Sequence, residues 1–274
     1  MDKNNTYYQP DYHLLNRKAK RCPANGNNMQ GKEMLERIFP GSKKAEPSKA
    51  DPEILEQLSA AITEIKQSID WEQALFSASY VAFDTETTGL HPYKDDEIIS
   101  IGAVIIENNT ILNKPVYYQL VNPRRSVSVQ SQKITGITDD MLRDKPELSE
   151  ILLDFLDFTG PRILVAHNAS FDLAFINNKV SELIGRRIVN PVIDTVLLAS
   201  ALYYSFGDYS LESLAARFKL DLAGRHNALA DARIAASLFL KLLPELKTRG
   251  ITNLHQLAQF FSDLDLTKGY PLIF

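Results

Sequence analysis

The sequence predicts an α/β domain built around a mixed β-sheet. Five short apolar runs have the composition of strands, at residues 80–83, 97–107, 111–121, 163–166 and 188–193. The second and third runs are joined by Asn108-Asn109, a pair that favours a tight hairpin, whereas the later runs alternate with segments of helical periodicity. Hairpins followed by alternating strands and helices favour a sheet with both antiparallel and parallel pairs.

Residues 1–50 precede this domain and are polar, with little periodicity. They contain ten Lys or Arg and five Asp or Glu, a net charge of +5, and since the whole chain carries −4, the remaining residues carry −9. We expect a basic, disordered arm. Its patch Arg17–Arg21 could touch nucleic acid, and a solvated tail is the alternative interpretation.

Residues 51–78 are interpreted as an amphipathic helical extension. Pro52 suits a first helical position, and apolar side chains recur every three or four residues, at Leu55, Leu58, Ile62, Ile65 and Ile69. Barely two heptads are present, which is short for a dimerising coiled coil. We therefore expect the apolar stripe of this helix to pack on the α/β domain.

Further helices are expected between and after the strands, beginning near Thr138 and Asn168 and covering residues 148–158 and 228–243. Three acidic residues at predicted helix starts are interpreted as capping residues rather than metal ligands: Asp139, Asp140 and Asp194. Residues 246–274 are expected to form a C-terminal helix and an apolar tail. This tail would dock on the domain or enter the pocket of a partner.

The composition is that of a soluble globular protein, with 45% hydrophobic and 23% charged residues. The single cysteine, Cys22, excludes a disulfide framework and a cysteine-based zinc site. The sequence has neither an apolar N-terminal signal segment nor an apolar run of membrane-spanning length. We therefore expect a cytoplasmic protein with no membrane partner.

Two acidic residues, Asp84 and Glu86, follow the first apolar run at a spacing of two. On a strand, residues i and i+2 point to the same face, so both carboxylates can bind one object. Paired anionic oxygens suit a hard divalent cation. The alternative is a pair of solvated acids where the strand end meets a turn.

Three more polar residues follow at the edges of predicted elements. Asp172 comes shortly after the apolar run 163–166, at the start of a predicted helix, where complementing the helix dipole is an alternative role. His226 and Asp231 flank the start of the helix over 228–243. Five helical positions subtend about 500°, so two helical residues at that spacing would diverge. We therefore expect His226 in the loop before the helix and Asp231 in its first turns.

With these residues the sequence resembles the DEDDh, or DnaQ-like, 3′–5′ exonucleases, over about Ser79 to Leu243. The resemblance implies a ribonuclease H-like fold over residues 79–245, with a five-stranded sheet that has one antiparallel strand. Two positions depart from the common pattern: Thr135 where many relatives carry His, and Asn227 where Arg is frequent. Both departures could alter substrate contacts.

The resemblance also implies the roles of the motif residues. Asp84 would be shared by two Mg²⁺ or Mn²⁺ ions, with Glu86, Asp172 and Asp231 as the other ligands and His226 as the general base. The turn Thr87-Thr88-Gly89-Leu90 would lie near the 3′-terminal nucleotide. Asn168 and Phe171 are further substrate-binding candidates, and core packing is the alternative role for Phe171.

The expected function is metal-dependent 3′–5′ hydrolysis of single-stranded DNA to nucleoside 5′-monophosphates, in replication proofreading or repair. The negative charge of the domain argues against extended duplex binding and favours short single-stranded or frayed 3′ ends. A DNA polymerase or another replication or repair protein is a possible partner. An exoribonuclease that trims RNA is the alternative enzyme, and an inactive nucleic-acid-binding scaffold is the alternative from another class.

Overall fold

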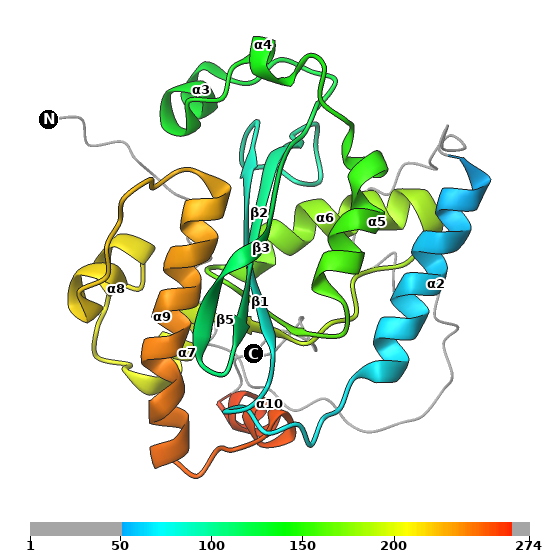
Figure 1. Cartoon of the computed structure of the whole chain (residues 1–274). Coiled ribbons are helices and arrows are strands. Elements are labelled where there is room, and N and C mark those ends of the chain that lie inside the picture. The colour runs from blue at the N-terminus through cyan, green and yellow to red at the C-terminus, as the bar shows by residue number, and fades with distance from the viewer. Residues whose placement is uncertain (1–50, 265–274) are drawn as a thin grey trace, which may run out of the picture. The chain divides into compact units, whose positions relative to one another are not determined.

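The computed structural model describes residues 51–264 and contains a five-stranded mixed sheet in the order β3-β2-β1-β4-β5 (Figure 1). The strands are β1 (Tyr80–Thr87), β2 (Ile98–Glu107), β3 (Thr110–Leu120), β4 (Ile163–Ala166) and β5 (Val192–Asp194). Strand β2 is antiparallel to both of its neighbours, whereas β1, β4 and β5 are parallel. The predicted α/β fold with one antiparallel strand is therefore confirmed.

Two strands differ in length from their predictions. Strand β1 continues through both predicted ligands, Asp84 and Glu86, as far as Thr87, whereas a turn had been expected directly after the apolar run. The β-branched side chains of Thr85 and Thr87 suit a pleated strand, and the continued pairing with β2 holds this segment extended. Strand β5 is shorter than predicted and begins only at Val192.

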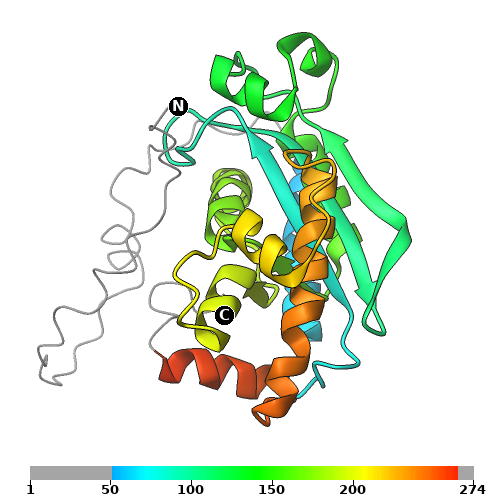
Figure 2. The same ribbon diagram turned by 90° about the vertical axis from the view of Figure 1, so that its left-hand side faces the viewer.

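The side chains of β1 alternate between two cores on opposite faces of the sheet. Tyr80 and Ala82 belong to the core beneath α9 (Ala228–Thr248), which runs along the sheet (Figure 2). Val81 and Phe83 belong to the core covered by three other helices: α2 (Pro52–Ser68), α5 (Leu148–Thr159) and α6 (Ala169–Ile184). Because Asp84 and Glu86 continue the series of Tyr80, they face α9.

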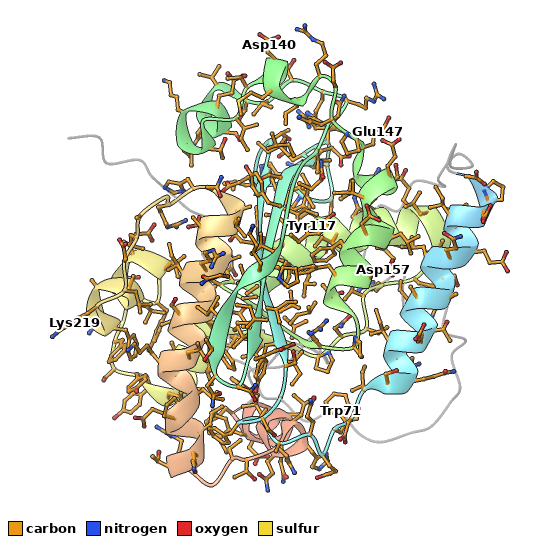
Figure 3. The ribbon with its side chains drawn as sticks, viewed as in Figure 1. Trp71, Tyr117, Asp140, Glu147, Asp157 and Lys219 are labelled. Atoms are coloured by element: carbon orange, nitrogen blue, oxygen red, sulfur yellow. The ribbon has the colours of Figure 1, made fainter. Side chains whose placement is uncertain are left out.

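The amphipathic helix α2 packs on α5 and α6, as its apolar stripe predicts, through buried Leu58 and Ile62. Polar contacts supplement this packing, since Arg186 Nη1 donates to Ser59 O at 2.6 Å and to Thr63 Oγ1 at 2.7 Å. On the other side of α5, the ring of Tyr117 in β3 lies 5.6 Å from that of Phe155 (Figure 3). Helix α5 is thus enclosed between α2 and the sheet.

The segment between β3 and α5 contains two short helices where one was predicted, α3 (Val129–Thr135) and α4 (Asp139–Leu142). Gly136 separates them with a left-handed φ of 72°. The carboxylate of Asp139 does not cap α4 but accepts from Val127 N at 2.7 Å and ties the loop together, and Asp140 pairs with Arg143. Both acids lie in the first turn of α4, as predicted, but the capping prediction was wrong, because Asp139 bonds to the loop before α3 and Asp140 to the C-cap residue of α4, Arg143.

Three further helices complete the described chain: α7 (Thr195–Leu202), α8 (Leu211–Phe218) and α10 (Leu254–Asp263). Helix α10 lies near the start of β1, since Leu254 N donates to Gln73 O at 3.2 Å. Within residues 51–264 no helix has the length and apolar character that a membrane span requires. The basic patch Arg17–Arg21 and the tail Tyr270–Phe274 lie outside the described residues.

Candidate active site

Three carboxylates converge between the sheet and α9. Ligand oxygens of Asp84 and Glu86 on β1 and of Asp231 on α9 all lie within 4.8 Å of one another. Asp84 and Glu86 share a strand face, as their spacing predicts, and Asp231 projects from the first turn of α9. Asp231 is buried, whereas Asp84 and Glu86 are half-buried and remain open to a ligand.

The close approach of α9 to β1 depends on Gly102. This residue is the β2 partner of Asp84 and therefore points to the same face. A Cβ atom at Gly102 would lie 2.2 Å from Leu229 N and 2.3 Å from Ala228 C, both backbone atoms of the first turn of α9. A side chain here would push that turn away from the sheet, and Asp231 would move with it.

Asp172 reaches the cluster from the opposite face of the sheet. It is buried in the first turn of α6, and its Oδ1 accepts from Thr85 N at 2.9 Å and from Thr85 Oγ1 at 2.6 Å. Thr85 lies between Asp84 and Glu86, so Asp172 is adjacent to both although it is not one of the three converging ligands. Burial raises the pKa of Asp172 to about 7, although the bonds from Thr85 oppose this shift.

Burial and mutual repulsion disfavour the ionised forms of these acids. Burial, followed by the negative charges of Asp172 and Glu86, raises the pKa of Asp84 well above its ordinary value. Burial and the charge of Asp231 raise the pKa of Glu86 to about 8. A divalent cation among these oxygens would remove the repulsion and favour the ionised carboxylates.

Buried polar atoms without a partner gather around the same site. Within residues 51–264, four buried side-chain atoms lack a hydrogen-bond partner: Ser100 Oγ, Asn190 Oδ1, Arg225 Nε and Asp231 Oδ1. Ser100 is the β2 partner of Glu86, and Arg225 is paired with Asp231, so three of the four adjoin the carboxylates. Hard cations are bound by carboxylate oxygens, and a buried carboxylate oxygen that accepts no hydrogen bond is available as such a ligand. The site therefore fits a divalent metal ion.

His226 lies in the loop before α9, as predicted, with a left-handed φ of 67°. Its backbone N–H donates to Asp231 Oδ2 at 3.0 Å, which places the residue beside the cluster. The adjacent Asn227 caps α9, because its Oδ1 accepts from Leu229 N at 3.2 Å. Asn227 Nδ2 also donates to Tyr118 Oη at 3.2 Å, so this departure from the family pattern connects the His226 loop to β3.

The other departure, Thr135, stabilises the end of α3. Its Oγ1 donates to Ser131 O at 2.9 Å and accepts from Ile137 N at 3.1 Å. Both polar functions of the hydroxyl are therefore used within the turn around Gly136.

Arg225 is a residue of the site that sequence reasoning missed. Its Nη1 pairs with Asp231 Oδ2, and its Nη2 lies 2.7 Å from Glu212 Oε1 on α8. The position of Arg225 next to His226 was the only signal in the sequence. Glu212 lies thirteen residues upstream and carried no signal of its own.

Asp194 caps α7, as predicted, since its Oδ1 accepts from Val196 N at 2.8 Å. The same carboxylate also holds the loop before α6, because it accepts from Asn168 N at 3.1 Å and Ala169 N at 2.9 Å. Asn168 thereby adopts a left-handed φ of 61° at the N-cap of α6. The backbone N–H of Asn168, a predicted substrate-binding residue, thus fixes its position through Asp194, and its side chain does not cap α6.

Two aromatic side chains near Asn168, those of His167 and Phe171, are held by contacts within the protein. His167 Nδ1 lies 2.9 Å from Thr195 Oγ1, and burial, with the charge of Arg225, lowers the pKa of His167 to about 4. His167 is therefore a weaker base than an ordinary imidazole. Phe171 is half-buried and its ring lies 5.1 Å from that of Phe175, so core packing accounts for much of its surface.

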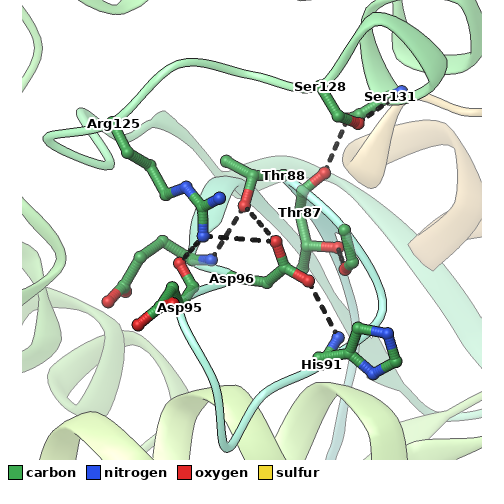
Figure 4. Close-up of polar contacts among 10 residues, drawn as sticks. Thr87, Thr88, His91, Asp95, Asp96, Arg125, Ser128 and Ser131 are labelled. Atoms are coloured by element: carbon green, nitrogen blue, oxygen red, sulfur yellow. Dashed lines mark hydrogen bonds and ion pairs between the residues drawn. The ribbon is translucent and has the colours of Figure 1, made fainter.

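The turn after β1 is organised around Asp96, whose carboxylate accepts from Thr88 Oγ1 and from His91 N, both at 3.1 Å (Figure 4). Arg125 approaches the same carboxylate at 3.3 Å. A Cβ atom at Gly89 would lie 2.4 Å from Asp96 Oδ2, so the absence of a side chain at Gly89 makes room for this carboxylate. Gly89 therefore allows a contact within the turn itself.

Helix α3 is attached to the end of β1. Ser131 Oγ donates to Thr87 O at 2.6 Å, and Ser128 Oγ accepts from Ser131 N at 3.1 Å (Figure 4). Thr87 and Thr88 are buried, so their side chains shape the turn, whereas the side chain of Leu90 is 46% exposed. Of these predicted substrate-binding residues, Leu90 has the accessible side chain.

The sequence profile of the exonuclease family matches residues 81–239. The chain is 38% identical over 205 residues to the PolC-type DNA polymerase III of Thermotoga petrophila, covering 75% of this chain and 15% of that protein. It is 42% identical over 183 residues to a DNA polymerase III subunit epsilon-like protein of Rhodobacter capsulatus, covering 66% of this chain and 26% of that protein. The chain therefore spans less than a third of the length of these two relatives.

Among solved structures, exonuclease X in complex with 5′-overhanging duplex DNA is similar at a TM-score of 0.51 and 29% identity. The similarity covers 65% of this chain and 96% of that chain.

Proposed function

The chain belongs to the exonuclease family, in its DEDDh or DnaQ-like branch, and we propose that it is a metal-dependent 3′–5′ exonuclease acting on single-stranded DNA. The observation that carries this proposal is the convergence of Asp84, Glu86 and Asp231 within 4.8 Å of one another. Asp172 adjoins these residues through Thr85, and His226 adjoins them through its backbone bond to Asp231. The products would be nucleoside 5′-monophosphates.

Asp84, Glu86, Asp231 and Asp172 would hold the metal ions, two Mg²⁺ or Mn²⁺, with Asp84 as the shared ligand. When bound, two such ions supply a nucleophile at neutral pH and neutralise charge on the attacking and leaving oxygens of a phosphodiester. The unpartnered Asp231 Oδ1 and the raised pKa values of Asp84 and Glu86 support this assignment.

His226 is assigned as the general base that removes a proton from the attacking water. Its loop precedes the helix that carries Asp231, so the imidazole is attached beside the ligands without being one of them. Imidazole is well suited to this role near neutral pH. His167 is a poorer candidate, because burial lowers its pKa to about 4.

Single-stranded DNA is proposed as the substrate because the relatives are DNA polymerase III proteins and exonuclease X was solved with a DNA overhang. Leu90, exposed on the turn after β1, would contact the terminal bases. The other proposed substrate-binding residues are Thr87, Thr88, Gly89, Asn168 and Phe171. We also propose a DNA polymerase, or another replication or repair protein, as partner, because both relatives are DNA polymerase III proteins.

The proposal is tested by incubating the full chain with Mg²⁺ and 5′-labelled single-stranded DNA, RNA and mismatched duplex. We expect a ladder that shortens from the 3′ end, fastest on single-stranded DNA, with nucleoside 5′-monophosphates released. Asp84→Asn should abolish cleavage and retain the fold. The matched variant Asp157→Asn removes an exposed carboxylate on α5 and should cleave at the parent rate (Figure 3).

Equal cleavage in excess chelator, or by Asp84→Asn, would refute the metal-dependent mechanism. Faster cleavage of RNA than of DNA would show that RNA, and not DNA, is the preferred substrate. An inert parent protein that still binds 3′ ends would favour the scaffold interpretation.

A further inference from the structure

Arg225 places a permanent positive charge in direct contact with the carboxylate cluster. Its guanidinium bridges two acids, with Nη1 on Asp231 Oδ2 and Nη2 at 2.7 Å from Glu212 Oε1. The side chain of Arg225 is 24% exposed and that of Asp231 only 2%, so this pair is largely removed from solvent. Pairs of this kind depend on geometry, because a partner that is lost leaves a buried charge uncompensated.

The two oxygens of Asp231 have different environments. Oδ2 accepts two bonds, one from Arg225 Nη1 and one from the backbone N–H of His226 at 3.0 Å. Oδ1 is buried and has no partner in the protein. A carboxylate held through one oxygen presents the other in a fixed direction, which is how residues that contact a metal ligand commonly act. The contacts of Arg225 therefore leave Oδ1 available to a cation.

We propose that Arg225, braced by Glu212, is a positioning residue that orients Asp231 and the His226 loop for the reaction proposed above, on which this inference rests. Glu212 is on α8 and is not one of the converging carboxylates, and its ion pair to the site is with Arg225. The planar guanidinium donates to two carboxylates at once, which an ammonium group on a flexible stem does less well. This double contact explains why an arginine suits position 225 better than a lysine.

A different role for the same contacts would be a simple link between α8 and α9. The two helices already pack through buried apolar residues, among them Leu214 and Ala215 of α8. An ion pair between Arg225 and the half-exposed Glu212 that only linked the helices would contribute little to stability. It would also leave catalysis by the folded protein unchanged. Kinetics and local exchange therefore separate positioning from linking.

The first test uses Glu212→Gln, which leaves Arg225 and every converging carboxylate in place. Its matched control is Glu182→Gln, since the Lys179–Glu182 pair on α6 has nearly the same exposure, 21% and 45%, as the Arg225–Glu212 pair, 24% and 50%. Hydrogen–deuterium exchange is measured in chelator on the peptide containing residues 222–229, and kcat and KM are measured with Mg²⁺ on a short single-stranded oligonucleotide.

We expect Glu212→Gln to exchange faster in residues 222–229 and to lose roughly 10-fold in kcat, at the lower end of the usual cost of removing a residue that orients a metal ligand. KM should stay unchanged, because no substrate contact is lost. Glu182→Gln should match the parent in both measurements. Parent-like exchange and parent-like kcat in Glu212→Gln would overturn the proposal.

The second test compares Arg225→Lys with Arg225→Gln. Lysine retains the charge but loses the double contact, so kcat should fall for both variants and fall further for glutamine. Arg217→Gln is the control, because Arg217 lies over the ring of Phe206, away from the carboxylates. Full kcat in Arg225→Lys would show that charge alone suffices and would overturn the positioning role. An inactive parent would refute the proposed function, while the exchange data would still test the bridge.

Discussion

Asp84 of β1 and Gly102 of β2 are direct partners across the sheet, and the missing side chain of Gly102 makes room for the first turn of α9. That turn carries Asp231, so the sheet partner of one proposed ligand sets the distance to another. The site is thus assembled by backbone packing as much as by its acidic side chains.

Gly102→Ala tests this relationship. The new Cβ would lie 2.2–2.3 Å from backbone atoms of α9, so the helix must shift. We expect a loss of about 1–3 kcal/mol in the free energy of unfolding, typical of overpacking. Cleavage should fall by about 10²-fold, because small displacements of reacting groups are costly. Gly207→Ala is the control for destabilisation alone, because its φ of 78° disfavours alanine while nothing lies within 4 Å of its Cβ position, so it should lose stability and keep its cleavage rate. A fully active Gly102→Ala would contradict the packing argument.

The stability of the metal-free protein should decrease as the pH rises. Burial raises the pKa of Glu86 from 4.5 to about 8 and that of Asp172 from 3.8 to about 7. The folded state therefore binds more protons than the unfolded state between the ordinary and the raised pKa values. The contribution of these two protonated acids to the free energy of unfolding is complete below about pH 4 and lost by about pH 8. Urea unfolding in chelator should show the free energy of unfolding decreasing across this window.

Divalent metal should reverse this trend, because ligation needs ionised carboxylates. The same unfolding series with Mg²⁺ or Mn²⁺ should show greater stabilisation at pH 8 than at pH 5. Calorimetry in two buffers of different ionisation enthalpy should detect protons released on metal binding. A metal-free stability that is flat between pH 4 and pH 8 would contradict the raised pKa values.

The variant His226→Asn tests the role of His226 as general base and introduces little backbone strain. Residue 226 has a φ of 67°, a region that Asn adopts more readily than Ala. Single-turnover cleavage should fall about 10²–10⁴-fold, the usual contribution of a general base. Binding of Mn²⁺ and of an uncleavable oligonucleotide should persist, because the backbone bond to Asp231 remains. Cleavage at the parent rate, or loss of Mn²⁺ binding, would rule out the assigned role.

Leu90→Ala tests the exposed side chain of the turn after β1. Leu90 is 46% exposed, and covering the rest of a leucine side chain contributes about 1 kcal/mol, or roughly fivefold in affinity. We expect weaker binding of 3′ ends. We also expect a larger rate loss on paired ends than on single strands, because a side chain that wedges against the terminal bases helps to open a base pair. Leu264→Ala is the control, because Leu264 is 45% exposed and directly follows α10, which contributes no residue to the carboxylate cluster. Equal losses on both substrates would exclude a role in opening paired ends.

Much of the fold and part of the site could be predicted from local patterns. The hairpin at Asn108-Asn109, the strand Ile163–Ala166 and the loop position of His226 were all confirmed, because turn residues, apolar runs and helix caps act over a few neighbouring positions. The shared face of Asp84 and Glu86 likewise follows from strand geometry alone.

The way in which these pieces meet depends on packing between segments that are distant in the chain. The extension of β1 to Thr87 depends on pairing with β2, and the approach of α9 depends on Gly102, eighteen positions from Asp84 in the chain but its neighbour in the sheet. The bridge of Arg225 to Asp231 and Glu212 joins three elements and has no local signature. The sequence alone determined which chemical groups are present and which strand face they occupy. Their convergence required packing between distant segments, whose contacts are set by shape and burial.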